Sequence, residues 1–212
     1  RSTDYEKLLS RGLDWVIATA QEKMAGLSFT VEEQDQYHFY KAVIIQCEGV
    51  IAWARRYAAL AREMAQGEKD PVRKEELERI AEVCEWVPAN PARDFYEALQ
   101  SQWFIHLGQA LEEAPWAVTP GRVDQHWYPY YKRDIEEGRI TREQAMELVA
   151  LFIIKLNEIV VIMDGLTRQN AQGNLAQYFT LGGQTREGED AVNELTFLVL
   201  QALGQVRLSQ PL

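Results

Sequence analysis

Residues 119–131, with the sequence TPGRVDQHWYPYY, contain the densest group of side chains in this protein that could take part in chemistry. The stretch opens with a Pro-Gly turn signal and continues through Arg122, Asp124 and His126 into four aromatic residues. Guanidinium, carboxylate and imidazole groups are those that proteins use for ion pairing and for acid–base catalysis. Two interpretations follow: the stretch is a working site, or it is a densely packed corner between helices.

Metal binding has little support in the sequence. There are three histidines, and His38 has one carboxylate, Asp35, three positions earlier. A di-iron helical bundle needs two Glu-x-x-His pairs and two further carboxylates. We therefore expect no metal site. His106 shares an apolar helical stripe with Trp103, which favours a hydrogen-bonded core histidine over a metal ligand.

Nucleophilic and phosphate-binding chemistry is also weakly supported. Cys47 and Cys84 have no basic neighbour in the sequence, so we expect reduced cysteines packed in helices. There is no Gly-x-Ser-x-Gly nucleophile motif. Gly182 and Gly183 are not followed by the Lys-Ser/Thr pair of a phosphate loop, so a close backbone approach at a strand end is the favoured interpretation.

The charge balance excludes several classes of partner. The formal net charge is −10, whereas nucleic-acid and anionic-membrane binding both need clustered Lys and Arg. No apolar run approaches the roughly 18–20 residues of a membrane span. The N-terminal sequence RSTDYEKLLSRG lacks the apolar region of a signal peptide, so we expect a cytoplasmic protein without a nucleic-acid or membrane partner.

The apolar periodicity predicts a mainly helical chain, whose helices must position residues 119–131 and the other candidate side chains. The predicted helices cover about 3–25, 31–66, 71–86, 91–112, 141–163 and 190–203. Predicted N-terminal caps are Thr30 with Glu33, Asp70 with Pro71, Asn90, and Thr141 with Gln144. Residues 119–131 are expected to form a loop. One or two short strands are expected, the clearest at 177–183, where residue types alternate.

Two of these elements indicate a segment of a larger protein. A helix over 31–66 would be about 50 Å long, more than the roughly 40 Å expected across a compact body of this size. A lone strand cannot satisfy its own backbone hydrogen bonds, so 177–183 needs partners that this chain scarcely supplies.

Several stretches, in order along the chain, resemble the glycyl radical enzymes, the pyruvate formate-lyase-like family. They include DYEKLLSRGL, FYKAVIIQCEGVIAWARRYAALAREMA, RIAEVCEWVPANPARDFYEALQSQWFIHL, TPGRVDQHWYPYYKRDIEEGRITREQAMEL, FTLGGQTREGEDAVNELTFLVLQAL and VRLSQP. The resemblance implies that residues 1–212 are an N-terminal and middle part of one such domain, with no internal domain boundary. The implied fold is part of an α/β barrel of ten strands wrapped by helices.

The resemblance also implies what this chain lacks. In the family, a stored glycyl radical near the C-terminus generates a thiyl radical on a loop cysteine, and both lie downstream of the matching segment. Cys47 and Cys84 do not match that cysteine, so we expect no catalytic residue here and an inactive chain in isolation. The implied partners are a small organic substrate, a radical S-adenosylmethionine activating enzyme, and a second copy or small accessory subunits.

The resemblance places the substrate contact just before the stretch quoted first. Diol and glycerol dehydratase-like members have Gly-His-Ser-Ile-Ser-Pro-Gly-Arg here, whose His-Ser pair touches substrate hydroxyls. This chain has Trp116 and Ala117 instead, and the resemblance then makes Thr119, Arg122 and Asp124 a scaffold behind the pocket wall. The alternative is that Trp116 only packs the turn.

An indole and a methyl suit an apolar substrate. The first expectation is therefore the branch that adds hydrocarbons such as toluene to fumarate, the succinate synthases, or one that decarboxylates arylacetates. A diol dehydratase with an altered turn, and a non-catalytic helical scaffold derived from the fold, remain as alternatives.

Overall fold

The structure is a computed structural model that describes residues 3–28, 30–31, 33–113, 117–159, 165 and 175–208. The chain forms two compact units, one of residues 7–92 and the other of residues 1–6 with 93–212. The short first helix, α1 (Tyr5–Arg11), has residues in both units.

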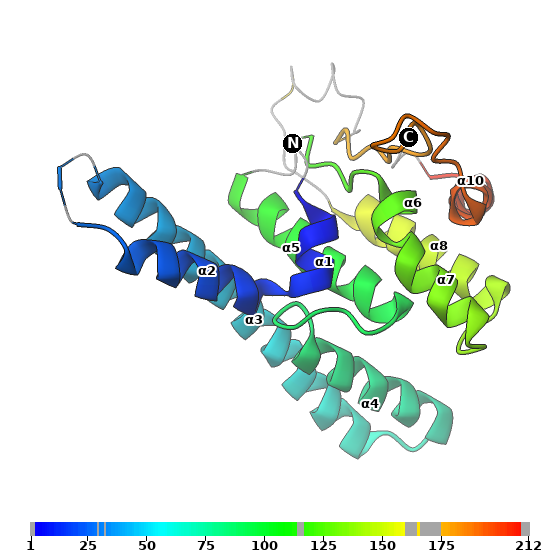
Figure 1. Ribbon diagram of the computed structural model, residues 1–212. Coiled ribbons are helices and arrows are strands. Elements are labelled where there is room, and N and C mark those ends of the chain that lie inside the picture. The colour runs from blue at the N-terminus through cyan, green and yellow to red at the C-terminus, as the bar shows by residue number, and fades with distance from the viewer. Residues whose placement is uncertain are drawn as a thin grey trace. The chain divides into compact units, whose positions relative to one another are not determined.

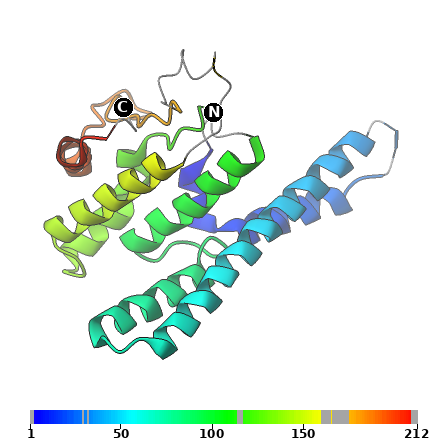
Figure 2. The ribbon, with the colours of Figure 1, turned by 180° about the vertical axis from the view of Figure 1, so that it is seen from behind.

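The unit of residues 7–92 is built along one long helix. This helix is α3 (Gln34–Gly67), and its 34 residues correspond to about 51 Å. Its first half packs against α2 (Leu13–Ala25) and its second half against α4 (Pro71–Trp86), as Figures 1 and 2 show from opposite sides. Along its second half α3 buries a stripe of alanines at helical spacing, Ala54, Ala58, Ala61 and Ala65, whose small side chains permit close helix packing.

The single helix expected over 3–25 is wrong, because Gly12 divides it into α1 and α2. Gly12 has φ +76°, and a Cβ there would lie 2.3 Å from the carbonyl oxygen of Ala89. The first amides of α2 are satisfied by that same loop: Leu13 N–H donates to Pro88 O at 2.8 Å and Asp14 N–H to Ala89 O at 2.9 Å. The break therefore serves a close backbone approach, which replaces a side-chain cap.

The predicted caps in this unit are confirmed in part. The Asp70 carboxylate accepts the amide of Val72 at 3.0 Å, as expected at the start of α4. The cap at Thr30 is wrong: α3 begins at Gln34 with Glu33 as its N-cap residue. The Glu33 carboxylate accepts the amide of Thr30 at 3.2 Å, so only one of the two capping-box bonds forms.

The cap expected at Asn90 is also wrong. The Asn90 amide donates to the carbonyl of Trp86 at 3.0 Å and so serves the preceding helix. The next helix, α5 (Phe95–Glu113), begins four residues later than expected at 91, and the Asp94 carboxylate accepts the amide of Glu97 at 2.7 Å.

The second unit packs helices around an aromatic core. After α5 come α6 (Val123–His126), α7 (Tyr128–Glu136), α8 (Arg142–Glu158) and α10 (Glu194–Val206), and α8 contacts both α5 and α10. The fully buried ring of Trp127 meets Phe95 and Phe152 edge to face, with centroids 6.5 and 5.1 Å away. The capping box at Thr141 and Gln144 is confirmed.

Residues 119–131 are not a simple loop, which corrects the expectation. They contain α6 and the start of α7, with Pro129 in the first turn of α7, where its missing amide hydrogen costs no helical bond. The burial of Trp127 and Tyr131 outweighs the turn-forming composition of the stretch.

The expected strand at 177–183 does not form. The described residues contain no strand, and isolated bridges join Gly121 with Phe179, parallel, and Gln184 with Asp190, antiparallel. A strand needs a ladder of backbone bonds, and here residues 175–180 have a short turn beside them. The part of the predicted helix beyond residue 159 falls mostly outside the described residues. None of the described helices is long and apolar enough to cross a membrane.

Candidate substrate-binding turn

Two short segments lie side by side in the second unit. Residues 117–122 form one, which we term the substrate turn, and residues 175–182 form the other, the facing segment. The amide of Ala117 donates to the carbonyl of Leu175 at 2.9 Å, and the amide of Thr180 donates to the carbonyl of Gly121 at 3.0 Å. Backbone bonds therefore fix both ends of the substrate turn.

Arg122 and Asp124 hold the end of the facing segment at one residue, Gly182. The guanidinium of Arg122 donates to the carbonyl of Gly182 at 2.6 Å. The fully buried carboxylate of Asp124 accepts the amide of Gly182 at 2.6 Å through Oδ2 and the hydroxyl of Thr196 at 2.6 Å. Gly182 has φ +62°, and a Cβ there would lie 3.0 Å from a side-chain methyl of Val192, so the position favours glycine, although the strand end expected there does not form.

Further bonds tie α6 to the start of α10. The side chain of Asn193, which caps α10, donates to the carbonyl of Asp124 at 2.8 Å. The amide side chain of Gln125 donates to the carbonyl of Ala191 at 2.8 Å. These contacts make the region behind the substrate turn one hydrogen-bonded block.

A second group of buried polar side chains centres on Gln102 of α5. Its side-chain nitrogen donates to the carbonyl of Pro120 at 2.9 Å, so its oxygen must act as the acceptor for the indole of Trp127 at 2.6 Å and for Nε2 of His126 at 2.7 Å. His126 thus donates through Nε2. Burial lowers the pKa of His126 to about 3, so its ring stays neutral and acts as a structural donor rather than an acid at neutral pH.

His106, one helical turn after Gln102, forms a third buried contact. Its Nε2 lies 2.7 Å from the side-chain oxygen of Gln177, whose nitrogen donates to the carbonyl of Leu156 at 3.1 Å. Burial lowers the pKa of His106, although the bond to Gln177 acts in the opposite direction. The prediction of a hydrogen-bonded core histidine is confirmed.

Gln102 and Gln177 were not predicted from the sequence as site residues. A signal was available for each, since Gln102 lies one turn from His106 in an apolar helix and Gln177 shares the alternation of Phe179 and Leu181. A polar side chain on an apolar face needs a buried partner.

The predicted substrate residues are only partly within the described structure. Trp116 lies outside the described residues. Ala117 is half-buried and has φ +59°, which is uncommon for a residue with a side chain. Thr119 is half-buried in the same turn. The bonds of Arg122 and Asp124 are of the kind a scaffold makes, and the pocket-wall role of the three scaffold residues stays a prediction.

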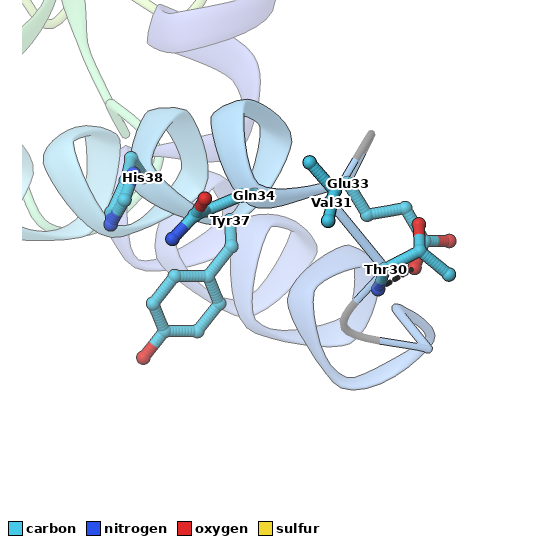
Figure 3. Close-up of a pocket in the computed structure, with 6 residues that line it drawn as sticks. All are labelled: Thr30, Val31, Glu33, Gln34, Tyr37 and His38. Carbon is cyan, nitrogen blue, oxygen red and sulfur yellow. Dashed lines mark hydrogen bonds between the residues drawn. The ribbon is translucent and has the colours of Figure 1, made fainter.

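A cavity of about 460 Å³ lies elsewhere, at the start of α3 in the first unit (Figure 3). Its lining consists of Thr30, Val31, Glu33, Gln34, Tyr37 and His38. Figure 3 shows the Glu33 carboxylate turned toward the backbone of Thr30 and away from His38. The described residues contain no group of three side chains able to hold a metal ion. The Glu33 carboxylate and the His38 imidazole therefore do not point toward one another in this cavity.

The two cysteines do not provide a reactive thiol in the described structure. Both are free, with Cys47 in α3 and Cys84 in α4. Burial raises the pKa of Cys84 to about 11, and burial followed by the charge of Glu48 raises the pKa of Cys47. That neither is the radical-forming cysteine stays a prediction from the family resemblance.

Comparison with known proteins narrows the choice among the enzyme branches expected from the sequence. The chain is 43% identical, over 98% of its length and 26% of the relative's, to an isethionate sulfite-lyase of Oleidesulfovibrio alaskensis. It is 36% identical, over 94% of its length and 23% of the relative's, to an indoleacetate decarboxylase of Tractidigestivibacter scatoligenes. The chain therefore spans about a quarter of the length of these relatives.

Solved structures are also similar to this chain. A glycyl radical enzyme of Archaeoglobus fulgidus matches with TM-score 0.93 and 40% identity, over 99% of this chain and 27% of that one. A structure concerned with 1,2-propanediol dehydration in Roseburia inulinivorans matches with TM-score 0.93 and 38% identity, over 98% of this chain and 25% of that one. These similarities lie with lyases and dehydratases, which corrects the expectation that ranked the succinate synthases first.

The match to the solved glycyl radical enzyme structure supports a mainly helical chain that corresponds to part of a longer fold. The family model described as pyruvate formate lyase-like matches residues 2–212. The chain belongs to the pyruvate formate lyase-like family of glycyl radical enzymes.

Proposed function

We propose that this chain is part of the catalytic subunit of a glycyl radical lyase, an enzyme that breaks a bond to carbon in a small organic substrate. The observation that carries the proposal is the 43% identity to an isethionate sulfite-lyase across 98% of the chain. The segment contributes one wall of the substrate pocket, while the radical-bearing residues belong to other parts of the full-length protein.

The substrate turn supplies an apolar surface to that pocket. Trp116 and Ala117 carry neither a hydroxyl nor an imidazole, so a substrate hydroxyl buried against them without another partner would cost about 1–3 kcal/mol. The polar groups of the substrate are therefore bound by other parts of the enzyme, and this turn contacts the carbon skeleton. Behind it, Arg122 and Asp124 keep the turn in place through Gly182.

A second candidate reaction is arylacetate decarboxylation. It is favoured by the apolar pair at 116–117 and by the 36% identity to an indoleacetate decarboxylase. A diol dehydratase with an altered turn is the third, supported by the match to the structure concerned with 1,2-propanediol dehydration.

The proposed cofactor is the glycyl radical of the full-length protein, and the proposed partner is a radical S-adenosylmethionine activating enzyme that installs it. We further propose a cytoplasmic enzyme that acts as a homodimer or with small accessory subunits. The isolated chain is expected to be inactive, since neither cysteine fits the radical position.

The test uses the full-length protein that contains this chain, activated without oxygen by its activating enzyme and checked for a glycyl radical by electron paramagnetic resonance. Four assays then run in parallel: sulfite release from isethionate, aldehyde formation from 1,2-propanediol, carbon dioxide release from indoleacetate, and toluene addition to fumarate. Turnover in one of the first three supports a lyase and selects its class. Turnover of toluene with fumarate alone contradicts the proposal.

A further inference from the structure

We propose that His106 and Gln177 form a positioning pair that sets the place of Ala117 in the substrate turn and thereby the substrate preference of the enzyme. The inference rests on the proposed role of the turn. It assigns a function to two buried residues that do not themselves touch the substrate.

The pair joins three elements at one point. His106 lies on α5, Gln177 in the facing segment, and Gln177 in turn reaches the last turns of α8 through the carbonyl of Leu156. Both polar side chains are fully buried. The facing segment is therefore fixed to two helices by side-chain bonds, in addition to its backbone bonds.

Gln177, which these side-chain bonds hold in place, lies close to the residue that binds Ala117. Gln177 is two residues after Leu175, whose carbonyl accepts the Ala117 amide. Ala176, the one residue between them, has φ +55°, so the chain bends there and brings Gln177 directly behind the residue that binds Ala117. A displacement of Gln177 is thus transmitted directly to the carbonyl that holds Ala117.

Ala117 needs such support because its backbone is strained. A left-handed conformation costs a residue with a side chain roughly 1–2 kcal/mol, and it persists only where the surroundings enforce it. The φ of +59° determines the direction of the Ala117 methyl group, and with it the surface offered to the substrate. Without its bond to Leu175, the turn would relax toward an ordinary conformation.

A buried histidine–glutamine pair is not the simplest way to fill a core. Two apolar side chains would avoid the cost of desolvating four polar atoms. A buried polar pair instead fixes one register between the segments that it joins. Arg122 and Asp124 hold the facing segment at Gly182, and the His106–Gln177 pair holds it at the opposite end, next to the residue that binds Ala117.

The experiment uses the activated full-length enzyme with the substrate identified above. Gln177→Leu and His106→Phe each remove the pair while keeping the volume close to the original. We expect KM to rise about 10-fold with kcat changed less than about 3-fold, because a wall that contacts the carbon skeleton binds the substrate and its transition state alike. The relative turnover of smaller and larger substrate analogues should change as well. His106→Gln retains a donor toward Gln177 and should restore most of the wild-type KM.

The matched control is Gln144→Leu, which removes a side-chain bond in the same unit, to the amide of Thr141 at 2.8 Å at the start of α8, and involves neither the substrate turn nor the facing segment. It should lower the melting temperature while leaving KM within about 2-fold. If Gln177→Leu does not accumulate as a folded enzyme, the comparison of His106→Gln with His106→Phe decides the same question.

Ala117→Gly separates this inference from the proposed function. If Ala117→Gly and Trp116→Ala change no kinetic parameter for any substrate, the turn does not contact substrate and the proposed function of the turn fails. If they change KM while both pair variants behave like Gln144→Leu, the proposed role of the turn is supported and the positioning inference is overturned. A positioning role further predicts non-additive effects of Ala117→Gly and Gln177→Leu on KM.

Discussion

At the scale of single residues, Asp124 has the most demanding environment near the substrate turn. Its fully buried carboxylate accepts the amide of Gly182 and the hydroxyl of Thr196 through one oxygen. The other oxygen has no partner among the described residues. A buried charge with few partners is stable only when those it has are well placed, so the packing behind the turn depends on this residue.

Asp124→Ala should therefore destabilise the enzyme strongly. It leaves two buried donors without an acceptor, a loss of about 2–4 kcal/mol that lowers the melting temperature of the full-length protein by several degrees. The matched control is Asp190→Ala, since Asp190 is exposed and its carboxylate accepts the amide of Val192 at 3.0 Å. Equal effects of the two substitutions in differential scanning calorimetry would show that burial of Asp124 is not what stabilises this region.

His126 should make stability depend on pH. Burial lowers its pKa to about 3, below its ordinary value of 6.5, so the unfolded chain takes up a proton in acid that the folded chain does not. The contribution of the neutral His126 ring to the free energy of unfolding is fully present above pH 6.5. It decreases as the pH falls toward 3, by up to about 1.4 kcal/mol per pH unit. The lowered pKa of His106 acts in the same direction.

The measurement is the melting temperature of wild type and His126→Gln between pH 7.5 and pH 5. The wild type should lose stability more steeply with acid than the variant, because glutamine has no proton to take up. Parallel curves would mean that His126 is protonated in the fold.

At the scale of elements, the junction between α1 and α2 is the most constrained. Gly12 combines a positive φ with backbone atoms where a side chain would lie. We expect Gly12→Ala to cost about 2–5 kcal/mol, the sum of the left-handed penalty and of overpacking.

Gly49→Ala is the matched control, since Gly49 lies inside α3 and an alanine methyl group at that position would have nothing within 4 Å. Alanine there should stabilise the helix by up to about 1 kcal/mol. The change from glycine to alanine should therefore lower the melting temperature at position 12 and raise it at position 49. A Gly12→Ala enzyme as stable as Gly49→Ala would contradict the close approach to Ala89.

At the scale of the whole molecule, the second unit leaves apolar side chains exposed. On the packed pair α8 and α10, Leu151, Ile154, Phe197 and Leu200 are each at least 38% exposed. The chain spans about a quarter of its relatives' length, so the full-length protein has ample sequence to cover them.

The isolated chain should therefore bind a hydrophobic dye and self-associate in size-exclusion chromatography. Replacing Phe197 and Leu200 with glutamate should reduce both effects. A monodisperse isolated chain that melts cooperatively and binds no dye would instead favour the helical scaffold alternative.

The sequence predicted the features that depend on neighbours along the chain. The start of α4 at Asp70 and Pro71 and the capping box at Thr141 were predicted correctly because each involves residues within one helical turn. The core position of His106 followed from its apolar stripe. The ordered motifs also predicted the family, since they extend over the whole length that matches the family model.

The features that were missed depend on residues far apart in the sequence. Gly12 breaks a helix because of the backbone of Ala89, and the expected strand at 177–183 lacks a ladder of partners. The scaffold contacts join Arg122 and Asp124 to Gly182 across about 60 positions, and His106 to Gln177 across 71.

The sequence by itself thus determined most of the long helices, the caps at Asp70 and Thr141, and the family, because periodicity and short motifs record local physics. Only the tertiary structure decided which polar side chains hold the substrate turn. Gln102, His106 and Gln177 carry no local signature of their partners, and burial alone makes those hydrogen bonds necessary.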